Sequence, residues 1–132
     1  MDTKQVIVIR KDLKMRKGKM VAQATHATKL MLLQYADFDS NGFRLEYDRF
    51  GQHSEAIKAW INGLFTTTVV SVDSEAEFLD IEQKAKERGL IVAKITDAGK
   101  TEFHGIPTLT ALSVGPANIG EFIGVTDHLK LL

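Results

Sequence analysis

A short apolar strand, followed at once by a basic loop and a long helical pattern, constrains this fold more than any other feature of the chain. Residues 5–9 are mostly β-branched, as expected for a strand buried on both faces of a sheet. Residues 11–17 form a polar loop, and from 18 to 35 apolar residues recur at helical spacing. A buried strand that leads into a helix indicates an α/β domain.

The rest of the chain continues the alternation of strand and helix. The expected elements are turn chemistry at 37–42, a helix at 54–61, a strand at 66–72, a helix between 73 and 89, strands at 90–95 and 108–114, a turn at 115–118 and a last short helix through 119–125. Strands joined by a helix should pair in parallel, whereas the short loop before the fourth strand permits it to be antiparallel. The prediction is a single α/β domain over residues 1–132.

Composition excludes several classes of site. The chain has 132 residues and no cysteine, so disulfides, thiolate metal sites and a cysteine nucleophile are excluded. The four histidines are scattered without the close pairs typical of metal ligands. No apolar run approaches the ~20 residues of a membrane span, and the apolar N-terminal segment is too short for a signal peptide. These features are compatible with a cytoplasmic protein.

The charges are unevenly distributed although the formal net charge is zero. Up to residue 30 eight basic residues stand against two acidic ones, and from 37 to 87 acidic residues outnumber basic ones. A local basic patch on a neutral body can steer an anionic partner. A solvated surface loop explains the same charges equally well.

The helix expected from residue 18 carries a polar face. Lys19, Gln23 and His26 have the spacing i, i+4, i+7 and therefore project from one side of the helix. Lys19 falls in the first turn, where backbone N–H groups and the helix dipole also attract anions. Lys19 could stabilise an oxyanion, Gln23 could orient a substrate and His26 could act as a base. An ordinary solvated helix face is the simpler interpretation of this spacing alone.

A second group of polar residues follows the third strand. Open α/β sheets bind ligands at the carboxyl ends of their strands, and Asp97 and Gly99 lie at such an end. Because the first and third strands should end at the same edge, Lys19 and Asp97 could meet there. Such a contact lowers the pKa of the carboxyl and keeps it ionised, so Asp97 would act mainly by orienting water. Thr101 and Thr110 offer hydroxyl groups, although a simple Asp-Gly turn also fits.

Aromatic and basic residues alternate between 43 and 50. Phe43, Tyr47 and Phe50, together with Arg44 and Arg49, could stack on nucleic-acid bases. Packing of an inserted loop against the core is the simpler explanation.

Several segments match one known family in order. They are residues 4–15, the signature Gly18-Lys19-x-x-Ala22-Gln23-x-x-His26-Ala27, the motif Asp97-Ala98-Gly99-Lys100-Thr101, the residues Thr108, Thr110 and Gly115-Pro116, and the closing segment 128–131. On these residues the chain resembles the archaeal/eukaryotic-type peptidyl-tRNA hydrolases. The match nearly fills both ends of the chain.

The resemblance implies a three-layer α/β/α domain with a four-stranded mixed sheet, commonly dimeric. It implies hydrolysis of the ester that joins a peptide to tRNA, which releases free tRNA without a metal or organic cofactor. The residues that match the active positions or the signature of the family are Lys19, Gln23, His26, Asp97, Thr101 and Thr110. The basic residues expected to hold the tRNA backbone are Lys11, Lys14, Arg16, Lys17 and Lys100.

The chain also departs from the family pattern. Lys100 and Glu102 stand where the family usually has Arg and Gln, and the connection at about 36–54 is longer than in compact members. Lysine keeps the charge of arginine but loses its bidentate fork for phosphate. Two alternatives therefore remain open beside the peptidyl-tRNA hydrolase: a non-enzymatic module on the same fold that binds nucleotide, RNA or protein, and a hydrolase of a smaller ester or amide.

Overall fold

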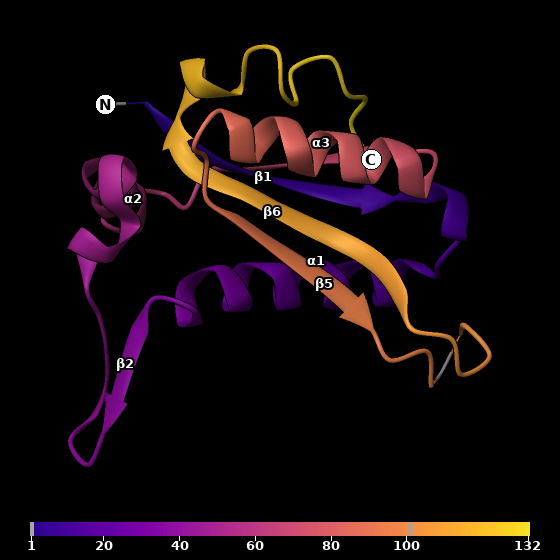
Figure 1. Ribbon diagram of the computed structural model, residues 1–132, viewed down its shortest axis with the longest axis horizontal. Coiled ribbons are helices and arrows are strands. Elements are labelled where there is room, and N and C mark those ends of the chain that lie inside the picture. Colours follow the sequence, from indigo (N-terminus) through magenta and orange to yellow (C-terminus); the bar gives the residue numbers. More distant parts are fainter. Residues whose placement is uncertain (1, 101) are drawn as a thin grey trace.

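A four-stranded mixed sheet forms the centre of the computed structural model, which describes residues 2–100 and 102–132. Its strands are β1 (Thr3–Arg10), β4 (Thr67–Val72), β5 (Val92–Asp97) and β6 (Thr108–Asn118). They lie side by side in the order β4-β1-β6-β5 (Figure 1). β1 pairs in parallel with β4, and β6 is antiparallel to both β1 and β5. The antiparallel pairing that the sequence permits for the strand at 108–114 is thus observed in β6.

The helices cover the two faces of this sheet because side chains of β1 alternate between them. Val6 and Val8 enter a core with α3 (Glu75–Glu87), whereas Ile7 and Ile9 enter a core with α1 (Lys17–Leu33). α2 (Ser54–Ile61) packs with the far end of α1 through a third cluster that includes Met31, Ile57 and Trp60. This arrangement confirms the predicted three-layer α/β/α architecture and explains why residues 6–9 are apolar without interruption.

The turn predicted at 115–118 is wrong, because β6 continues through Gly115 and Pro116 to Asn118. The pairing of β1 with β6 shifts register between Lys4 and Val6, opposite this point, and then resumes at Ala117. Proline lacks an N–H and is tolerated inside a sheet where a bulge interrupts the ladder. The expected last helix is a short 3-10 helix, η3 (Ile119–Phe122), and turns follow it.

The long connection at 36–54 contains a β-hairpin, which the sequence did not predict. Its strands are β2 (Ala36–Asp39) and β3 (Gly42–Leu45), and a 3-10 helix, η2 (Tyr47–His53), leads back to α2. The hairpin extends away from the layered body (Figure 1). Among the described residues, no helix is long and apolar enough to span a membrane.

Candidate active site

Helix α1 and strands β5 and β6 bring the predicted site residues together. β1 ends at Arg10, a 3-10 turn η1 (Lys11–Leu13) follows, and α1 then runs back across the sheet. Its polar flank faces the carboxyl end of β5 and the first residues of β6. The parallel directions of β1 and β5 therefore place the start of α1 beside the end of β5, as the sequence predicts.

Lys19 and Asp97 are in direct contact. The Lys19 Nζ donates a hydrogen bond of 2.8 Å to the Asp97 Oδ1, and each side chain is only 15 % exposed. Pairs of opposite charge interact more strongly when they are partly removed from water. The contact thus joins the first turn of α1 to the last residue of β5 and leaves both groups within reach of the surface.

Gln23 and Thr110 support this pair from below. The Thr110 hydroxyl donates to the Gln23 Oε1 at 2.6 Å, and the Gln23 Nε2 donates to the Asp97 Oδ1 at 3.4 Å. Gln23 is 2 % exposed and Thr110 is fully buried. Because both polar groups are buried and paired, they fix the position of the carboxylate rather than meet a ligand directly.

The loop after β5 closes over the contact. The Gly99 N–H donates to the Asp97 Oδ2 at 2.8 Å, so both carboxylate oxygens are held. Gly99 has φ +83°, and a Cβ at this position would collide with the backbone of Ile106. The Phe103 ring lies 5.7 Å from the Lys19 Nζ, within the range of a cation–π contact. The loop therefore orders the pair from the side that faces solvent.

The electrostatics favour an ionised Asp97. The hydrogen bond from Lys19 is the main reason that the pKa of Asp97 lies below its usual range, and the Gly99 N–H acts in the same direction while burial opposes them. The site can therefore offer a fixed carboxylate beside a fixed ammonium. Among the described residues, no group of three His, Asp or Glu side chains is arranged to hold a metal ion.

Other predicted residues lie outside this cluster. His26 is exposed on α1, and no hydrogen bond among the described residues joins it to the pair. Lys100 is exposed on the loop after β5, and Thr101 lies outside the described residues. Arg16 is 90 % exposed, with its guanidinium 3.8 Å from the Glu102 carboxylate.

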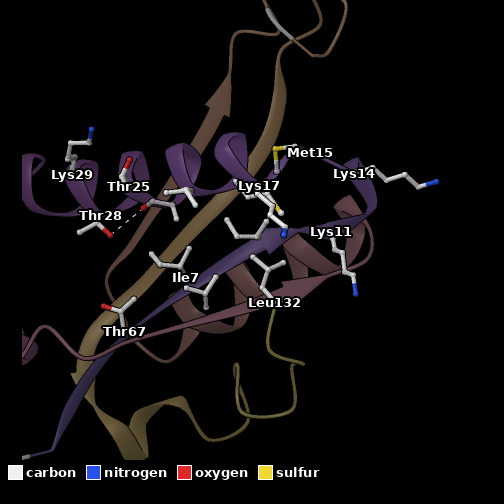
Figure 2. A pocket seen from close by; sticks show the side chains of 15 residues that line it. Ile7, Lys11, Lys14, Met15, Lys17, Thr25, Thr28, Lys29, Thr67 and Leu132 are labelled. Carbon is white, nitrogen blue, oxygen red and sulfur yellow. Dashed lines mark hydrogen bonds between the residues drawn. The ribbon is translucent and has the colours of Figure 1, made fainter.

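Lys11, Lys14 and Lys17 line a groove on the opposite flank of α1, with a volume of about 1130 Å³. Ile7 and Val69, from two neighbouring strands, lie on its apolar floor. Figure 2 shows these three lysines gathered at one end of it. The predicted basic loop therefore borders both flanks of the helix.

Sequence reasoning missed the residues that anchor the start of α1. The Arg10 guanidinium donates to both Asp12 carboxylate oxygens, at 3.2 and 2.6 Å, and to the Leu109 carbonyl oxygen at 3.2 Å. Arg10 is 7 % exposed. The available signal was an arginine that directly follows an apolar strand and stands two residues before an aspartate. A buried arginine requires such a partner. Phe103 carried a weaker signal as an aromatic residue in a polar loop.

Comparison with known proteins finds relatives that match nearly the whole chain. The family model described as peptidyl-tRNA hydrolase PTH2 matches residues 3–132. The Methanocaldococcus jannaschii protein named peptidyl-tRNA hydrolase is 39 % identical over 129 residues, which cover 98 % of this chain and 99 % of that protein. The peptidyl-tRNA hydrolase of Thermococcus onnurineus is 37 % identical, with 98 % and 97 % covered.

A eukaryotic relative and a solved structure extend these matches. The Dictyostelium discoideum protein named "Probable peptidyl-tRNA hydrolase 2" is 39 % identical, and the match covers 98 % of this chain and 55 % of that longer protein. A solved structure of a protein of unknown function from Agrobacterium tumefaciens covers 100 % of this chain and 98 % of its own, with a TM-score of 0.60 and 11 % identity. At this identity the likeness concerns the fold alone.

Proposed function

Because the chain belongs to the PTH2 family of peptidyl-tRNA hydrolases, we propose that it hydrolyses the ester between peptide and tRNA and releases free tRNA. The observation that carries this proposal is the 2.8 Å contact between Lys19 and Asp97, held from beneath by Gln23. Ester hydrolysis needs an oriented water and a positive group for the charge that develops on the carbonyl oxygen. In the pair, the Asp97 carboxylate can orient the water and the Lys19 ammonium is the positive group.

In the proposed reaction Asp97 accepts a hydrogen bond from water and aims its oxygen at the carbonyl carbon of the ester. Lys19 stabilises the negative charge that forms on the carbonyl oxygen. The oxygen of water forms a bond to the carbonyl carbon and the bond to the ribose oxygen breaks. One proton of the water passes to the ribose oxygen, which leaves as a hydroxyl of free tRNA, and the other is released to solvent as the peptide leaves as a carboxylate. Gln23 and Thr110 act as positioning residues because they are buried and hold the carboxylate.

The remaining predicted residues are assigned to substrate contact. Thr101 follows Lys100 in the sequence, and we assign its hydroxyl to the water or the substrate. His26 is exposed one helical turn beyond Gln23, so we assign it to substrate contact rather than to the buried cluster. The basic residues proposed to hold phosphate groups of tRNA are Lys11, Lys14, Arg16, Lys17 and Lys100.

The proposal includes a homodimer without metal or organic cofactor. It also places the enzyme in the cytoplasm, where translation produces peptidyl-tRNA. A non-enzymatic RNA-binding or protein-binding module, or a hydrolase of a smaller ester, would use the same fold with a different chemistry at the pair.

The deciding experiment follows release of free tRNA from a purified peptidyl-tRNA by the wild-type protein and by Asp97→Asn. Release by the wild type and a loss of about 10²-fold or more in the variant would support the proposal. A wild-type protein that binds peptidyl-tRNA without releasing tRNA would favour the binding module. Cleavage of only a small ester such as an N-acylated amino-acid ester would favour the second alternative.

A further inference from the structure

The groove on the far flank of α1 combines an apolar surface with a basic rim. Its floor comes from β1 and β4, and Met20 and Val21 of α1 form part of one wall. Val21 is 64 % exposed, so its side chain adds accessible apolar surface to that of the floor. Four of its lining residues are lysines and no lining residue is acidic. Lys11, Lys14 and Lys17 lie at one end of the groove, and Figure 2 shows the fourth lysine, Lys29, near the other end. We call this surface the lysine groove.

The hairpin of β2 and β3 has the opposite character. Phe38 and Phe43 stack on each other with ring centroids 5.6 Å apart, yet they are 66 % and 60 % exposed. Residues 36–45 carry two carboxylates against one guanidinium group, so the hairpin is negative overall. An exposed aromatic pair on a projecting arm is typical of a segment that another surface covers.

We propose that the hairpin of one copy of this chain docks in the lysine groove of a second copy, and that the second hairpin docks reciprocally in the first groove. The two surfaces match in both respects: an exposed aromatic pair meets an apolar floor, and a negative arm meets a rim of lysines. The contact rests on the homodimer proposed above and gives it a surface, independently of the chemistry at Lys19 and Asp97.

The fold favours this pairing over the other arrangements. The hairpin follows the far end of α1 and extends away from the body, and none of its residues lines the groove of its own chain (Figure 1). A symmetric contact of groove with groove would place lysines against lysines. Reciprocal exchange avoids this repulsion and gives a closed dimer. A one-way contact would instead build an open-ended oligomer.

Nucleic acid is a poorer occupant of the hairpin and of the apolar floor of the groove. The hairpin is negative overall, so it repels phosphate groups, and its charged side chains form internal ion pairs such as Arg44 with Asp39 at 3.1 Å. The groove floor is aliphatic and offers no aromatic platform on which a base could stack. Lys11 and Lys14 extend from the end of the groove near the start of α1, which leaves them available for substrate (Figure 2).

Sedimentation velocity of the full chain tests the contact. We expect a dimer whose dissociation constant rises with salt, and a rise of at least about tenfold in both Phe38→Ser/Phe43→Ser and Val21→Asp. All three substituted positions are exposed, so circular dichroism should show an unchanged fold. A matched control is Leu79→Ser, which removes an exposed apolar residue from α3 on the other side of the sheet.

A charge exchange sharpens the test. Lys29→Glu alone and Asp39→Lys alone should each weaken the dimer, because both contacts then join like charges. An equimolar mixture of the two variants should restore it, because the mixed dimer has one native contact and one contact with both charges reversed. The double variant in a single chain should restore the dimer, because the reversed lysine meets the reversed aspartate of its partner. Failure of the double variant to recover at least half of the lost association would overturn the proposal.

Cross-linking locates the contact directly, because the chain has no cysteine. Val21→Cys mixed with Phe43→Cys should form a cross-linked pair with a short bis-maleimide, whereas Leu79→Cys mixed with Phe43→Cys should not. A monomeric wild type, a ladder of higher oligomers, or a dimer that survives the hairpin or groove variants would overturn the proposal. Release of tRNA, measured on the same samples, reports separately on the proposed hydrolase, so the two proposals fail independently.

Discussion

The two flanks of α1 differ in nearly every physical respect although they belong to one helix. On one flank Lys19 and Gln23 meet the end of β5 through hydrogen bonds, and the polar groups are buried or partly buried and paired. On the other flank Val21 and Met20 border an apolar groove over β1 and β4. The reactive polar side chains of α1 therefore do not meet in the groove, although the groove has a volume of about 1130 Å³.

The difference follows from the order of the strands. β6 and β5 lie beneath the polar flank and bring Thr110 and Asp97 to it, whereas β4 lies at the edge of the sheet on the other side. On this face of β4, Val69 contributes an apolar side chain to the groove floor. α1 therefore has one flank with paired polar groups and one flank with apolar side chains. We assign catalysis only to the polar flank.

Substituting Asp97 should produce the largest difference between the flanks. Asp97→Asn keeps the shape of the side chain but removes the charge that aligns water and pairs with Lys19, so turnover should fall about 10²-fold to 10³-fold. The measurement is the initial rate of tRNA release at saturating peptidyl-tRNA. Asp80→Asn, on an exposed turn of α3, is the matched control and should keep the wild-type rate.

Removing the buried support should have a smaller effect. Gln23→Leu leaves the Thr110 hydroxyl without its acceptor and loosens Asp97, so we expect about a tenfold lower rate and an unfolding free energy lowered by about 1–3 kcal/mol. Single-turnover kinetics and urea unfolding measure the two quantities. If stability falls while the rate stays unchanged, Gln23 has no part in positioning the carboxylate.

Changing the rim should alter affinity more than chemistry. Lys14 is exposed in the basic loop, and Lys14→Glu should raise KM several-fold while leaving kcat within about twofold of the wild type. The slope of the logarithm of affinity against the logarithm of salt concentration should become shallower by about 1, the contribution of one phosphate contact. A fall in kcat comparable to that of Asp97→Asn would place this lysine in the chemistry and remove the distinction between the flanks.

The pH dependence of stability gives the smallest signal. The pKa of Asp97 is lower in the folded protein than its ordinary value of 3.8, so its stabilising contribution is present above that value and is lost as pH falls through the folded pKa. Lys19→Met removes the main cause of the shift. The gap in unfolding free energy between wild type and variant should therefore shrink from pH 6 to pH 2 in urea titrations; a gap that widens would contradict the ion pair.

Much of this arrangement could be predicted from the sequence. The uninterrupted apolar run at 6–9 indicates a strand buried on both faces, and the meeting of Lys19 with Asp97 follows from two strands that end at one edge. The helix at 54–61 is confirmed to the residue. Patterns of this kind are local, so they survive in a single sequence without knowledge of the sheet order.

The rest depends on contacts between distant segments. Gln23 and His26 share a helical spacing, yet only Gln23 lies over Thr110 and is buried, because the pattern does not tell which polar residues the sheet will cover. Gly115 and Pro116 indicate a turn locally, but the register shift in β1 lets the strand continue. The hairpin was not predicted because Phe38 and Phe43 pack on each other and not on the core.

The most direct test of the central claim is the rate at which Lys19→Ala releases tRNA from a purified peptidyl-tRNA. We expect the rate to fall about 10²-fold or more while the circular dichroism spectrum stays unchanged, because the variant removes the positive group proposed to lie beside the reacting carbonyl. Lys58→Ala, which removes an exposed lysine from α2 of the same layer, should keep the wild-type rate. A Lys19→Ala rate within about twofold of the wild type would contradict the assignment of catalysis to this flank.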